Sequence, residues 1–529
     1  MATMQVDGAL EAAFLPTLGE VLRFHAARNR DGRALVFEGR TTTFGEFDTR
    51  ADRVAHALVD AGVATGDRIV YLGKNSDTFF ELLFGAARAG AVLTPIGWRL
   101  APDEVAFMLD DSEARLVVVG PDGDDQCDAA LSRTATQPRV IRTSDGSYAT
   151  WVGAASAAPF PAAADRHDVV IQLYTSGTTG HPKGVMLSHD NLQAAKRIPD
   201  LPETRWNRWK PSDVCLVVLP LSHVGGANWG LTGIVAGVPT IILREFDAEL
   251  ALAAIVEDGA SKIFIVPAAL RILLSQPGVR DADFSRLSHI LYGASPIPLE
   301  LLRESVEAFG CDFCQQYGMT ETSGTVTYLP PEDHGTVATP RMRSAGRPLP
   351  GVEIRIVDDA GRALAAGEVG EITVRSPMNM AGYWKREEAT RATIDAEGWL
   401  HTGDAGYLDA DGYLYIHDRL KDMIISGGEN IYPAEVESAL YDHPDVAEAA
   451  VIGVPDARWG EAVKAVVVRH PGASVDAETL IAFVAERIAR FKLPKSVDFI
   501  DALPRNASGK ILRRELRAPY WAGSSRMVN

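Results

Sequence analysis

The stretch RIVYLGKNSDTFFELLFGAARAGAVLTP, residues 68–95, contains a helical segment between two strand-like segments. Residues 68–72 and 91–95 are short apolar runs, whereas residues 79–87 carry their apolar side chains at helical spacing. Apolar residues recur at helical spacing before this stretch as well, at Phe47, Ala51, Val54, Ala55 and Leu58. Strands that alternate with helices favour a parallel sheet covered by helices on both faces.

The same alternation returns in the middle of the chain. From residue 169 onwards, strand-like apolar runs follow one another at residues 214–219, 239–243, 262–266 and 289–292. From about residue 352 to residue 415 the runs become shorter and are separated by Gly and Asp turns. We therefore expect residues 1–418 to form a large α/β domain of two doubly wound sheets with a β-rich subdomain.

A smaller second domain is expected at the C-terminus. Charged residues cluster at 418–422, and a new mixed α/β pattern occupies the rest of the chain. The pattern predicts an α+β domain at residues 422–529, joined to the first domain by residues 419–421.

The composition is that of a globular protein. The chain has 529 residues, too many for one ordinary domain, and 46% of them are hydrophobic. A formal net charge of −18 disfavours nucleic acid as a partner. The N-terminus has no basic region ahead of an apolar run, and the apolar runs stop well short of the about 20 residues of a membrane helix. We expect a soluble, cytoplasmic protein that binds no nucleic acid.

The four cysteines are too few and too irregularly spaced for a disulfide framework. Cys311 and Cys314 form a C-x-x-C pair, which could belong to a redox or a metal site. A structural zinc ion needs four ligands, and the sequence offers no second pair and no cluster of histidines to complete the set. We interpret the pair as two core thiols at the end of a strand.

The stretch YTSGTTGHPKG, residues 174–184, gathers Gly, Ser and Thr around a single lysine. The apolar run before it is typical of a buried strand, and Ser188 or Asp190 after it can cap a helix. A glycine-rich turn between strand and helix lets backbone N–H groups converge on a phosphate. Gly184 follows Lys183 where an ordinary P-loop has Ser or Thr, which indicates a different nucleotide chemistry. The alternative is a flexible polar linker.

Three further segments carry compatible chemistry. QQYGMTE at 315–321 combines an aromatic face with a hydroxyl and a carboxylate, HTGD at 401–404 places a carboxylate in a tight turn suited to a ribose diol, and PRNASGK at 504–510 ends in a lysine. With these motifs in this order, nearly the whole chain resembles the adenylate-forming superfamily. That superfamily contains acyl-CoA synthetases, the adenylation domains of peptide synthetases and beetle luciferases.

The resemblance implies that ATP and Mg²⁺ bind between these motifs. The β- and γ-phosphates would be held by Thr175, Ser176, Gly177, Thr178, Thr179 and Lys183. Adenine would lie on Tyr317, with Gln316 and Gly318 beside it, against the turn of Gly293, Ala294 and Ser295. Thr320 would contact the α-phosphate and Glu321 would bind Mg²⁺. Asp404 and Arg419 would bind the ribose hydroxyls. Taken singly, each of these residues also fits a structural role, and their joint occurrence favours the site.

The implied reaction has two halves. The acid attacks the α-phosphorus of ATP, with Lys510 stabilising the charge that builds in that step, and the thiol of coenzyme A (CoA) then displaces AMP. In the family, the mobile C-terminal domain swings about a residue that matches Lys421. The swing would bring Gly427 and Gly428 beside the pantetheine arm, where only a missing side chain leaves room. Weaker candidates for the CoA nucleotide are Trp459, Phe491 and Lys495. Leu493 stands where some relatives have a basic residue, which weakens these assignments.

The segment PLSHVGGANW, residues 220–229, would line the acid pocket. His223 would contact the carboxylate, although Ser222 stands where many relatives have an aromatic residue. The acyl group would lie among Gly225, Gly226, Asn228 and Trp229. The small residues indicate a roomy apolar pocket for a medium- or long-chain fatty acid or a bulky ring-bearing acid. No acidic residue is present to pair with an ammonium group, which disfavours amino acids.

Two alternatives stay open. One is an aryl acid of the benzoate or cinnamate type as substrate of the CoA ligase. The other is a nucleotide-binding paralogue without catalytic activity, against which Lys510, Glu321 and the intact loop argue.

Residues 205–210 combine basic side chains with two tryptophans. This composition is typical of a membrane interface, where indole rings lie at the headgroups and cations meet anionic lipid. Two interpretations stay open: a solvated loop whose tryptophans fold back onto the domain, and a peripheral membrane contact through residues 205–210. A homodimer is left open as the assembly.

Overall fold

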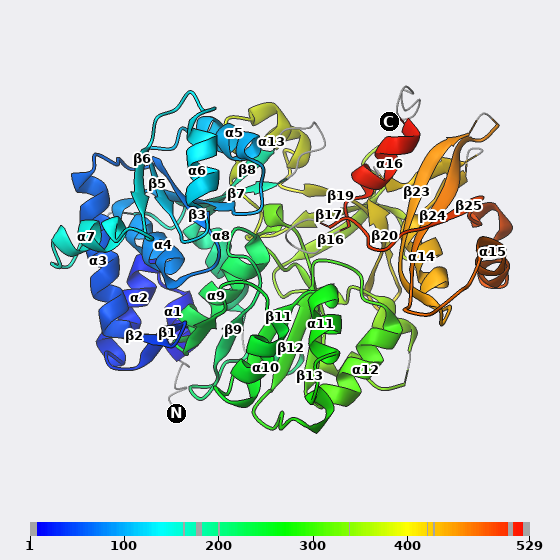
Figure 1. Cartoon of the computed structure of the whole chain (residues 1–529), viewed down its shortest axis with the longest axis horizontal. Coiled ribbons are helices and arrows are strands. Elements are labelled where there is room, and N and C mark those ends of the chain that lie inside the picture. The colour runs from blue at the N-terminus through cyan, green and yellow to red at the C-terminus, as the bar shows by residue number, and fades with distance from the viewer. Residues whose placement is uncertain are drawn as a thin grey trace.

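The computed structural model describes residues 8–161, 164–175, 182–198, 201–337, 339–419, 422–426, 429–456, 458–505 and 511–521, without the side chains of residues 8, 202, 203, 418, 419 and 430. Figure 1 shows the chain passing from an N-terminal part on the left, through a second part below the centre, to the C-terminal elements on the right.

The first sheet has seven strands in the order β18-β8-β7-β4-β3-β5-β6. Neighbours from β7 to β6 are parallel, whereas β8 and β18 are antiparallel additions at one edge. The strands are β3 (Arg68–Gly73), β4 (Val92–Gly97), β5 (Leu116–Val119), β6 (Arg139–Arg142), β7 (Val169–Thr175), β8 (Lys183–Ser188) and β18 (Gly382–Tyr383).

The helices of this part are α1 (Gly8–Ala13), α2 (Leu18–Arg28), α3 (Phe44–Asp60), α4 (Asp77–Ala89), α5 (Pro102–Ser112), α6 (Asp124–Leu131), α7 (Ser147–Ala154) and α8 (His189–Ala194). The side chain of Thr43 caps α3 by accepting from the Glu46 N–H, and Gly90 ends α4 in a left-handed conformation. The apolar residues predicted at helical spacing all lie on α3 and are buried, which confirms that prediction.

The second sheet has nine strands in the order β15-β14-β13-β12-β11-β9-β10-β1-β2. The six strands from β13 to β1 are parallel to their neighbours, and β14, β15 and β2 are antiparallel additions. The strands are β1 (Arg33–Phe37), β2 (Arg40–Thr43), β9 (Cys215–Val217), β10 (Thr240–Ile242), β11 (Lys262–Ile265), β12 (His289–Gly293), β13 (Asp312–Tyr317), β14 (Thr327–Leu329) and β15 (Arg347–Pro348). Its helices are α9 (Val224–Ala236), α10 (Ala248–Val256), α11 (Pro267–Leu274) and α12 (Leu299–Phe309).

The β-rich segment predicted after residue 352 is an antiparallel sheet in the order β16-β17-β19-β20. Its strands are β16 (Glu353–Val357), β17 (Gly370–Arg375), β19 (Leu400–Leu408) and β20 (Leu414–Arg419), and α13 (Glu387–Thr393) lies between β18 and β19 in the sequence. The predicted α/β architecture of two parallel-centred sheets with a β-rich subdomain is confirmed.

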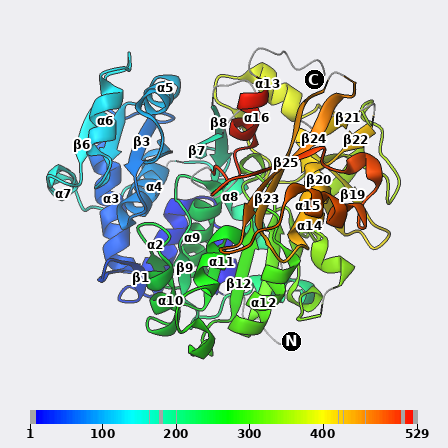
Figure 2. The ribbon, with the colours of Figure 1, turned by 45° about the vertical axis from the view of Figure 1, so that its right-hand side comes forward.

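The C-terminal elements have a hydrophobic core of their own, built around residues such as Val436, Val451 and Leu480. They are β21 (Ile424–Ser426), β22 (Glu429–Ile431), α14 (Pro433–Tyr441), β23 (Val446–Asp456), β24 (Gly460–Arg469), α15 (Ala477–Ala485), β25 (Ser496–Phe499) and α16 (Arg513–Trp521). Turning the molecule brings this part forward in Figure 2. The hinge predicted at residues 419–421 lies largely outside the described residues, so the boundary stays a prediction.

One local prediction is wrong. The glycine-rich loop connects the antiparallel strands β7 and β8 instead of a strand and a helix, because Val185 and Leu187 are buried in register with β7. Ser188 does cap a helix, α8, but only after the whole of β8.

The tryptophans of the basic segment do not lie on the surface. Trp206 is 5% exposed and Trp209 is 7% exposed, whereas Arg205, Arg208 and Lys210 are exposed. The interpretation of indole rings at a membrane interface is therefore wrong, and the alternative, that they fold back onto the domain, holds. Among the described residues, every helix is too short or too polar to span a bilayer.

Cys314 is buried on β13, and Cys311 is partly buried just before this strand. Burial raises the pKa of the Cys311 thiol to about 12 and that of Cys314 further. Because β13 begins at Asp312, the two thiols lie at the start of this strand, whereas we expected them at the end of a strand. Within the described part of the chain, no three His, Cys, Asp or Glu side chains gather as a metal site would require.

Candidate active site

The carboxylate of Glu321 joins three distant segments. Glu321 is buried in a short 3₁₀ turn, η4 (Thr320–Thr322), that follows β13. Its Oε1 accepts a hydrogen bond from the Tyr383 hydroxyl at 2.9 Å and another from Thr175 Oγ1 at 3.4 Å. Because Thr175 ends β7, the motif at 315–321 meets the mouth of the glycine-rich loop.

The two ends of that loop lie opposite each other. Thr175 pairs with Lys183 across the β7–β8 hairpin, and Lys183 Nζ lies 4.9 Å from the centre of the Tyr383 ring. Thr175 and Lys183 are thus brought to the same place, beside Glu321. The remaining predicted phosphate ligands, Ser176, Gly177, Thr178 and Thr179, lie outside the described residues.

A second carboxylate, Asp404, is linked to the aromatic residue of the 315–321 motif. Tyr317 donates its hydroxyl to Asp404 Oδ2 at 2.7 Å, and Asp404 is buried on β19. Asp404 pairs across the sheet with Arg419 of β20, whose side chain lies outside the described residues. The structure therefore brings Tyr317 and Asp404 together and sets the backbone of Arg419 beside them.

The turns around Tyr317 are tightly built. Gly293 pairs with Gln316 at the ends of β12 and β13, and Gln316 Oε1 accepts from Thr325 Oγ1 at 2.8 Å. Ala294 has φ +66°, a left-handed conformation that costs a non-glycine residue about 1 kcal/mol, and Ser295 follows it. A Cβ added to Gly318 would lie 1.5 Å from the carbonyl oxygen of Gly324, so two backbone segments touch there.

The predicted acid segment starts at the N-terminus of α9. His223 precedes this helix, and burial lowers the pKa of its imidazole to about 4, which keeps it neutral near pH 7. Asn228 donates from Nδ2 to the carbonyl oxygen of Ser323 at 2.8 Å and accepts from Lys196 Nζ at 2.5 Å. Asn228 therefore fixes α9 to the turn that carries Glu321.

The two glycines of this segment do not leave the open pocket that we expected. A Cβ on Gly226 would lie 2.3 Å from the carbonyl oxygen of Pro220, so its missing side chain serves close backbone packing. A Cβ on Gly225 would lie 3.2 Å from Cε1 of Phe264, so an aromatic ring of β11 fills the space beside it. Phe264 and Tyr383 are the site residues that sequence reasoning missed, because neither lies in a recognisable motif.

The C-terminal candidates are only partly described. Trp459 and Phe491 are 41% and 45% exposed, unusually high for large apolar side chains, and Lys495 is also exposed. Leu493 packs against the C-terminal core, which accounts for an apolar residue at that position. Lys421, Gly427, Gly428 and Lys510 lie outside the described residues. Arg505 and Ile511, which flank residues 506–510 in the sequence, form a β-bridge.

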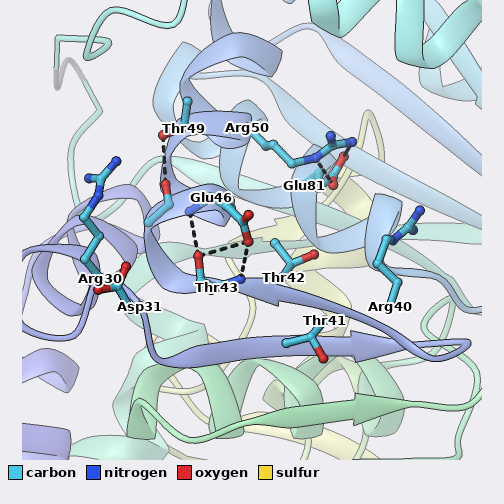
Figure 3. Close-up of a pocket in the computed structure, with 11 residues that line it drawn as sticks. Arg30, Asp31, Arg40, Thr41, Thr42, Thr43, Glu46, Thr49, Arg50 and Glu81 are labelled. Carbon is cyan, nitrogen blue, oxygen red and sulfur yellow. Dashed lines mark hydrogen bonds and ion pairs between the residues drawn. The ribbon is translucent and has the colours of Figure 1, made fainter.

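A polar groove of about 530 Å³ lies far from these motifs, between the β1–β2 hairpin and α3 (Figure 3). Two of its arginines are paired within the protein: Arg50 forms an ion pair with Glu81, and Arg40 with Asp77 at 2.5 Å. Thr43 and Glu46 in the same groove form the capping box of α3. These groups stabilise the fold locally, and the groove is not a candidate active site.

The comparisons agree with the motifs. The family model described as "AMP-binding enzyme" matches residues 22–384, and the model "AMP-binding enzyme C-terminal domain" matches residues 435–510. The chain belongs to the AMP-binding enzyme family.

Relatives in this family match nearly the full length of the chain. It is 43% identical to the fatty acid–[acyl-carrier-protein] ligase ScoC of Streptomyces coeruleorubidus, over 97% of this chain and 98% of the relative. It is 40% identical to a feruloyl-CoA synthase of an Amycolatopsis species, over 94% of this chain and 96% of the relative. Among solved structures, ATP-bound MatB from Rhodopseudomonas palustris matches with a TM-score of 0.85 and 33% identity, covering 95% of this chain and 99% of that chain.

Proposed function

We propose that this AMP-binding enzyme is an ATP-dependent acid–CoA ligase for a hydrophobic carboxylic acid. The observation that carries the proposal is the convergence of three motif segments, residues 174–184, 315–321 and 401–404. Thr175 meets Glu321, and Tyr317 meets Asp404, although these residues come from three different sheets. Together with Lys183, they supply cationic, hydroxyl and carboxylate groups around one place, which suits a nucleotide triphosphate.

The first half-reaction forms an acyl-adenylate. A carboxylate oxygen of the acid attacks the α-phosphorus of ATP, the bond to the β-phosphate oxygen breaks, and pyrophosphate leaves. In our proposal Thr175 and Lys183 hold the leaving phosphates, Thr320 contacts the α-phosphate, and Lys510 stabilises the charge of the transition state. Neutral His223 holds the attacking carboxylate by a hydrogen bond and does not compete with Lys510 as a second cation.

Mg²⁺ would enter as the partner of ATP. One buried carboxylate is enough for this ion, since Mg²⁺ is held mainly by the phosphates and by water. Glu321 fits this role because it is the carboxylate beside Thr175 and Lys183. Asp404 is instead engaged by Tyr317 and suits the ribose hydroxyls.

The second half-reaction transfers the acyl group to CoA. The thiol sulfur attacks the acyl carbon, the bond to the AMP oxygen breaks, and the thiol proton leaves to solvent. Gly427 and Gly428 would border the pantetheine arm after rotation of the C-terminal part about Lys421, with Trp459, Phe491 and Lys495 toward the CoA nucleotide. The exposed Trp459 and Phe491 support a ligand contact on this part of the protein.

The acid is a fatty or an aryl acid in this proposal. The segment around His223 carries no acidic side chain to pair with the ammonium group of an amino acid. The wall of aromatic and small residues around α9 favours an apolar acyl group.

A carrier protein is the second candidate acceptor. The relative at 43% identity is named as a ligase of fatty acids to acyl-carrier protein. Free CoA and a carrier protein present the same phosphopantetheine thiol, so both acceptors fit the same first half-reaction.

One experiment tests the function and separates the acceptors. A panel of fatty and aryl acids is incubated with ATP and Mg²⁺, and acid-dependent pyrophosphate exchange is measured. Thioester formation is then followed with CoA and, separately, with a phosphopantetheinylated carrier protein. Exchange with an acid of either class and thioester on CoA are expected. Absence of exchange with every acid would reject the proposal.

Two finer expectations stay proposals. A membrane contact through residues 205–210 would now rest on the exposed cations alone, because both tryptophans are buried. Neither this contact nor a homodimer is required by the proposed reaction.

A further inference from the structure

Three aromatic rings form a row behind the acid segment. Trp209, Trp229 and Phe264 come from the segment before β9, from α9 and from β11. The ring centres of Trp209 and Trp229 lie 5.5 Å apart, and those of Trp229 and Phe264 lie 6.2 Å apart. These distances are typical of contacting aromatic pairs. Trp229 and Phe264 are each 8% exposed, so the row is almost fully enclosed.

Phe264 lies where the acid and nucleotide segments approach each other. Its Cε1 would be 3.2 Å from a Cβ on Gly225, and its Cε2 would be 3.6 Å from a Cβ on Gly293. Gly225 belongs to the proposed acid pocket and Gly293 to the proposed adenine turn. An acyl group that extends from the proposed adenylate between these two segments would therefore meet the Phe264 ring, which is in contact with Trp229.

The row is held from behind by a buried lysine. Lys262 Nζ donates to the carbonyl oxygens of Trp206, at 3.3 Å, and of Arg208, and it lies 4.7 Å from the centre of the Trp209 ring. The carboxylate of Asp213 is 3.8 Å away. A buried ammonium group that lost these acceptors would be strongly destabilised, so the segment that carries Trp209 is fixed in place.

Trp229 is also fixed at its polar end. Its indole N–H donates to the carbonyl oxygen of Leu216 at 2.9 Å. The ring can neither rotate away without losing this bond nor retreat toward Trp209. The two residues in contact with the proposed pocket are thus backed by a stiff second layer.

We propose that Phe264 and Trp229, supported by Trp209 and Lys262, form the end wall of the acyl pocket and restrict the enzyme to compact acids, with a short chain or a single ring. The inference rests on the proposed ligase function and narrows its substrate class. A long alkyl chain would have to displace a ring or leave its far end unburied, and each unburied CH₂ group forfeits about fourfold in kcat/KM.

The test is a chain-length series on the full-length enzyme. Pyrophosphate exchange is measured with straight-chain acids from acetate to palmitate and with benzoate. The parent is expected to lose activity steeply beyond short chains. Trp229→Gly is expected to move the optimum to longer acids and to raise the ratio of long-chain to short-chain kcat/KM by at least about tenfold. Trp229→Leu, a milder truncation, is measured alongside and should move the optimum less.

The neighbouring tryptophans provide a matched pair. Trp206 and Trp209 lie close in sequence and are both buried, but the Trp206 ring faces Tyr328, at 5.1 Å between centres, and not Trp229. Trp209→Leu is expected to broaden the accepted chain length, whereas Trp206→Leu should lower stability without changing the ratio between acids. A general loss of stability would scale the activity on all acids equally.

Three outcomes would overturn the inference. The first is a parent enzyme that prefers palmitate to short acids and to benzoate. The second is an equal shift of the chain-length optimum in Trp206→Leu and Trp209→Leu. The third is no exchange with any acid, which would reject both the proposed function and this inference. The first two outcomes would reject only this inference.

Discussion

The nucleotide end and the acid end of the candidate site are built in different ways. At the nucleotide end, polar side chains from separate segments bond directly to one another, as Tyr317 does to Asp404 and Tyr383 to Glu321. At the acid end, the rings of Phe264, Trp229 and Trp209 follow one another, and His223 is kept neutral by burial.

This difference indicates that the nucleotide end recognises its ligand by matched polar groups and the acid end by shape. Hydrogen-bonded carboxylates can serve only a few ligands, because their lone pairs and charges must be matched. An apolar wall accepts many ligands of the right size, because dispersion and burial depend little on direction. We therefore expect the nucleotide end to control whether the reaction occurs and the acid end to control which acid is used.

The largest effect is expected from Lys510→Ala. Removing the cation that meets the transition-state charge should slow acyl-adenylate formation by roughly 10²- to 10³-fold. Attack of CoA on supplied acyl-AMP should stay largely intact, because that step does not involve the same charge. Single-turnover assays of each half-reaction measure the two rates. An equal loss in both half-reactions would show that Lys510 is not dedicated to adenylation.

A smaller effect concerns pH and the buried histidines. Burial lowers the pKa of both His189 and His223 to about 4, from an ordinary value of 6.5. The unfolded chain therefore takes up protons at a higher pH than the folded chain, so the stability that these two histidines contribute is fully present above pH 6.5 and is lost between pH 6.5 and about 4. For fully buried His189 the loss is about 3 kcal/mol.

Two variants separate the acid end from the rest of the fold. His189 Nδ1 accepts from the Leu18 N–H at 3.3 Å, and His189→Asn keeps an acceptor there without the titration. Urea unfolding at several pH values should give a flatter stability curve for both His189→Asn and His223→Asn. Only His223→Asn should also raise the KM for the acid. A changed KM for the acid in His189→Asn would show that the effect on the acid is not specific to His223.

A weaker effect is expected from Tyr317→Phe. The variant keeps the ring for adenine but leaves Asp404 without this donor, which should cost about 1 kcal/mol and raise the KM for ATP roughly fivefold. Tyr413→Phe is the matched control, because Tyr413 donates to Asp333 at 2.7 Å in a pair away from the motifs. Steady-state kinetics with ATP varied compare the two. Equal KM values in both variants would mean that the Tyr317–Asp404 bond does not shape the nucleotide end.

The smallest effect is expected for vesicle binding by the exposed cations of residues 205–210. It is measured in the triple variant Arg205→Glu, Arg208→Glu and Lys210→Glu. With the neighbouring indoles buried, only screened charge remains to attract anionic vesicles. Co-sedimentation should fall slightly at low salt and not at all at physiological salt, with activity on a short acid unchanged. A large loss at physiological salt would restore the membrane role of this segment.

The sequence is sufficient to predict the site residues that lie in motifs of characteristic chemistry. Thr175, Tyr317, Glu321 and Asp404 are all predicted as site residues, because the motifs that contain them combine hydroxyls, carboxylates and an aromatic ring and resemble those of the adenylate-forming superfamily. Their roles stay proposals, but the structure does bring them together.

The sequence was insufficient where long-range packing decides. Nothing local marks Tyr383 as the partner of Glu321, or Phe264 as the neighbour of Gly225. The same limit explains the hairpin after the glycine-rich loop, since the pairing of β8 with β7 depends on which edge of the sheet is free. The sequence left the basic segment undecided, because composition does not say which way an indole ring points.

Gly318 and Gly225 differ in the side chains that the structure tolerates at their positions. At Gly318 a methyl group would overlap the backbone of Gly324, which no side-chain movement relieves, whereas at Gly225 it would press on the edge of one ring, which can shift. In a library of all single substitutions, position 318 should therefore keep only glycine under any selection. Position 225 should accept different residues as the acid offered to the library changes. Glycine at position 318 therefore indicates an intact motif, whereas the residue at position 225 indicates which acid the enzyme uses.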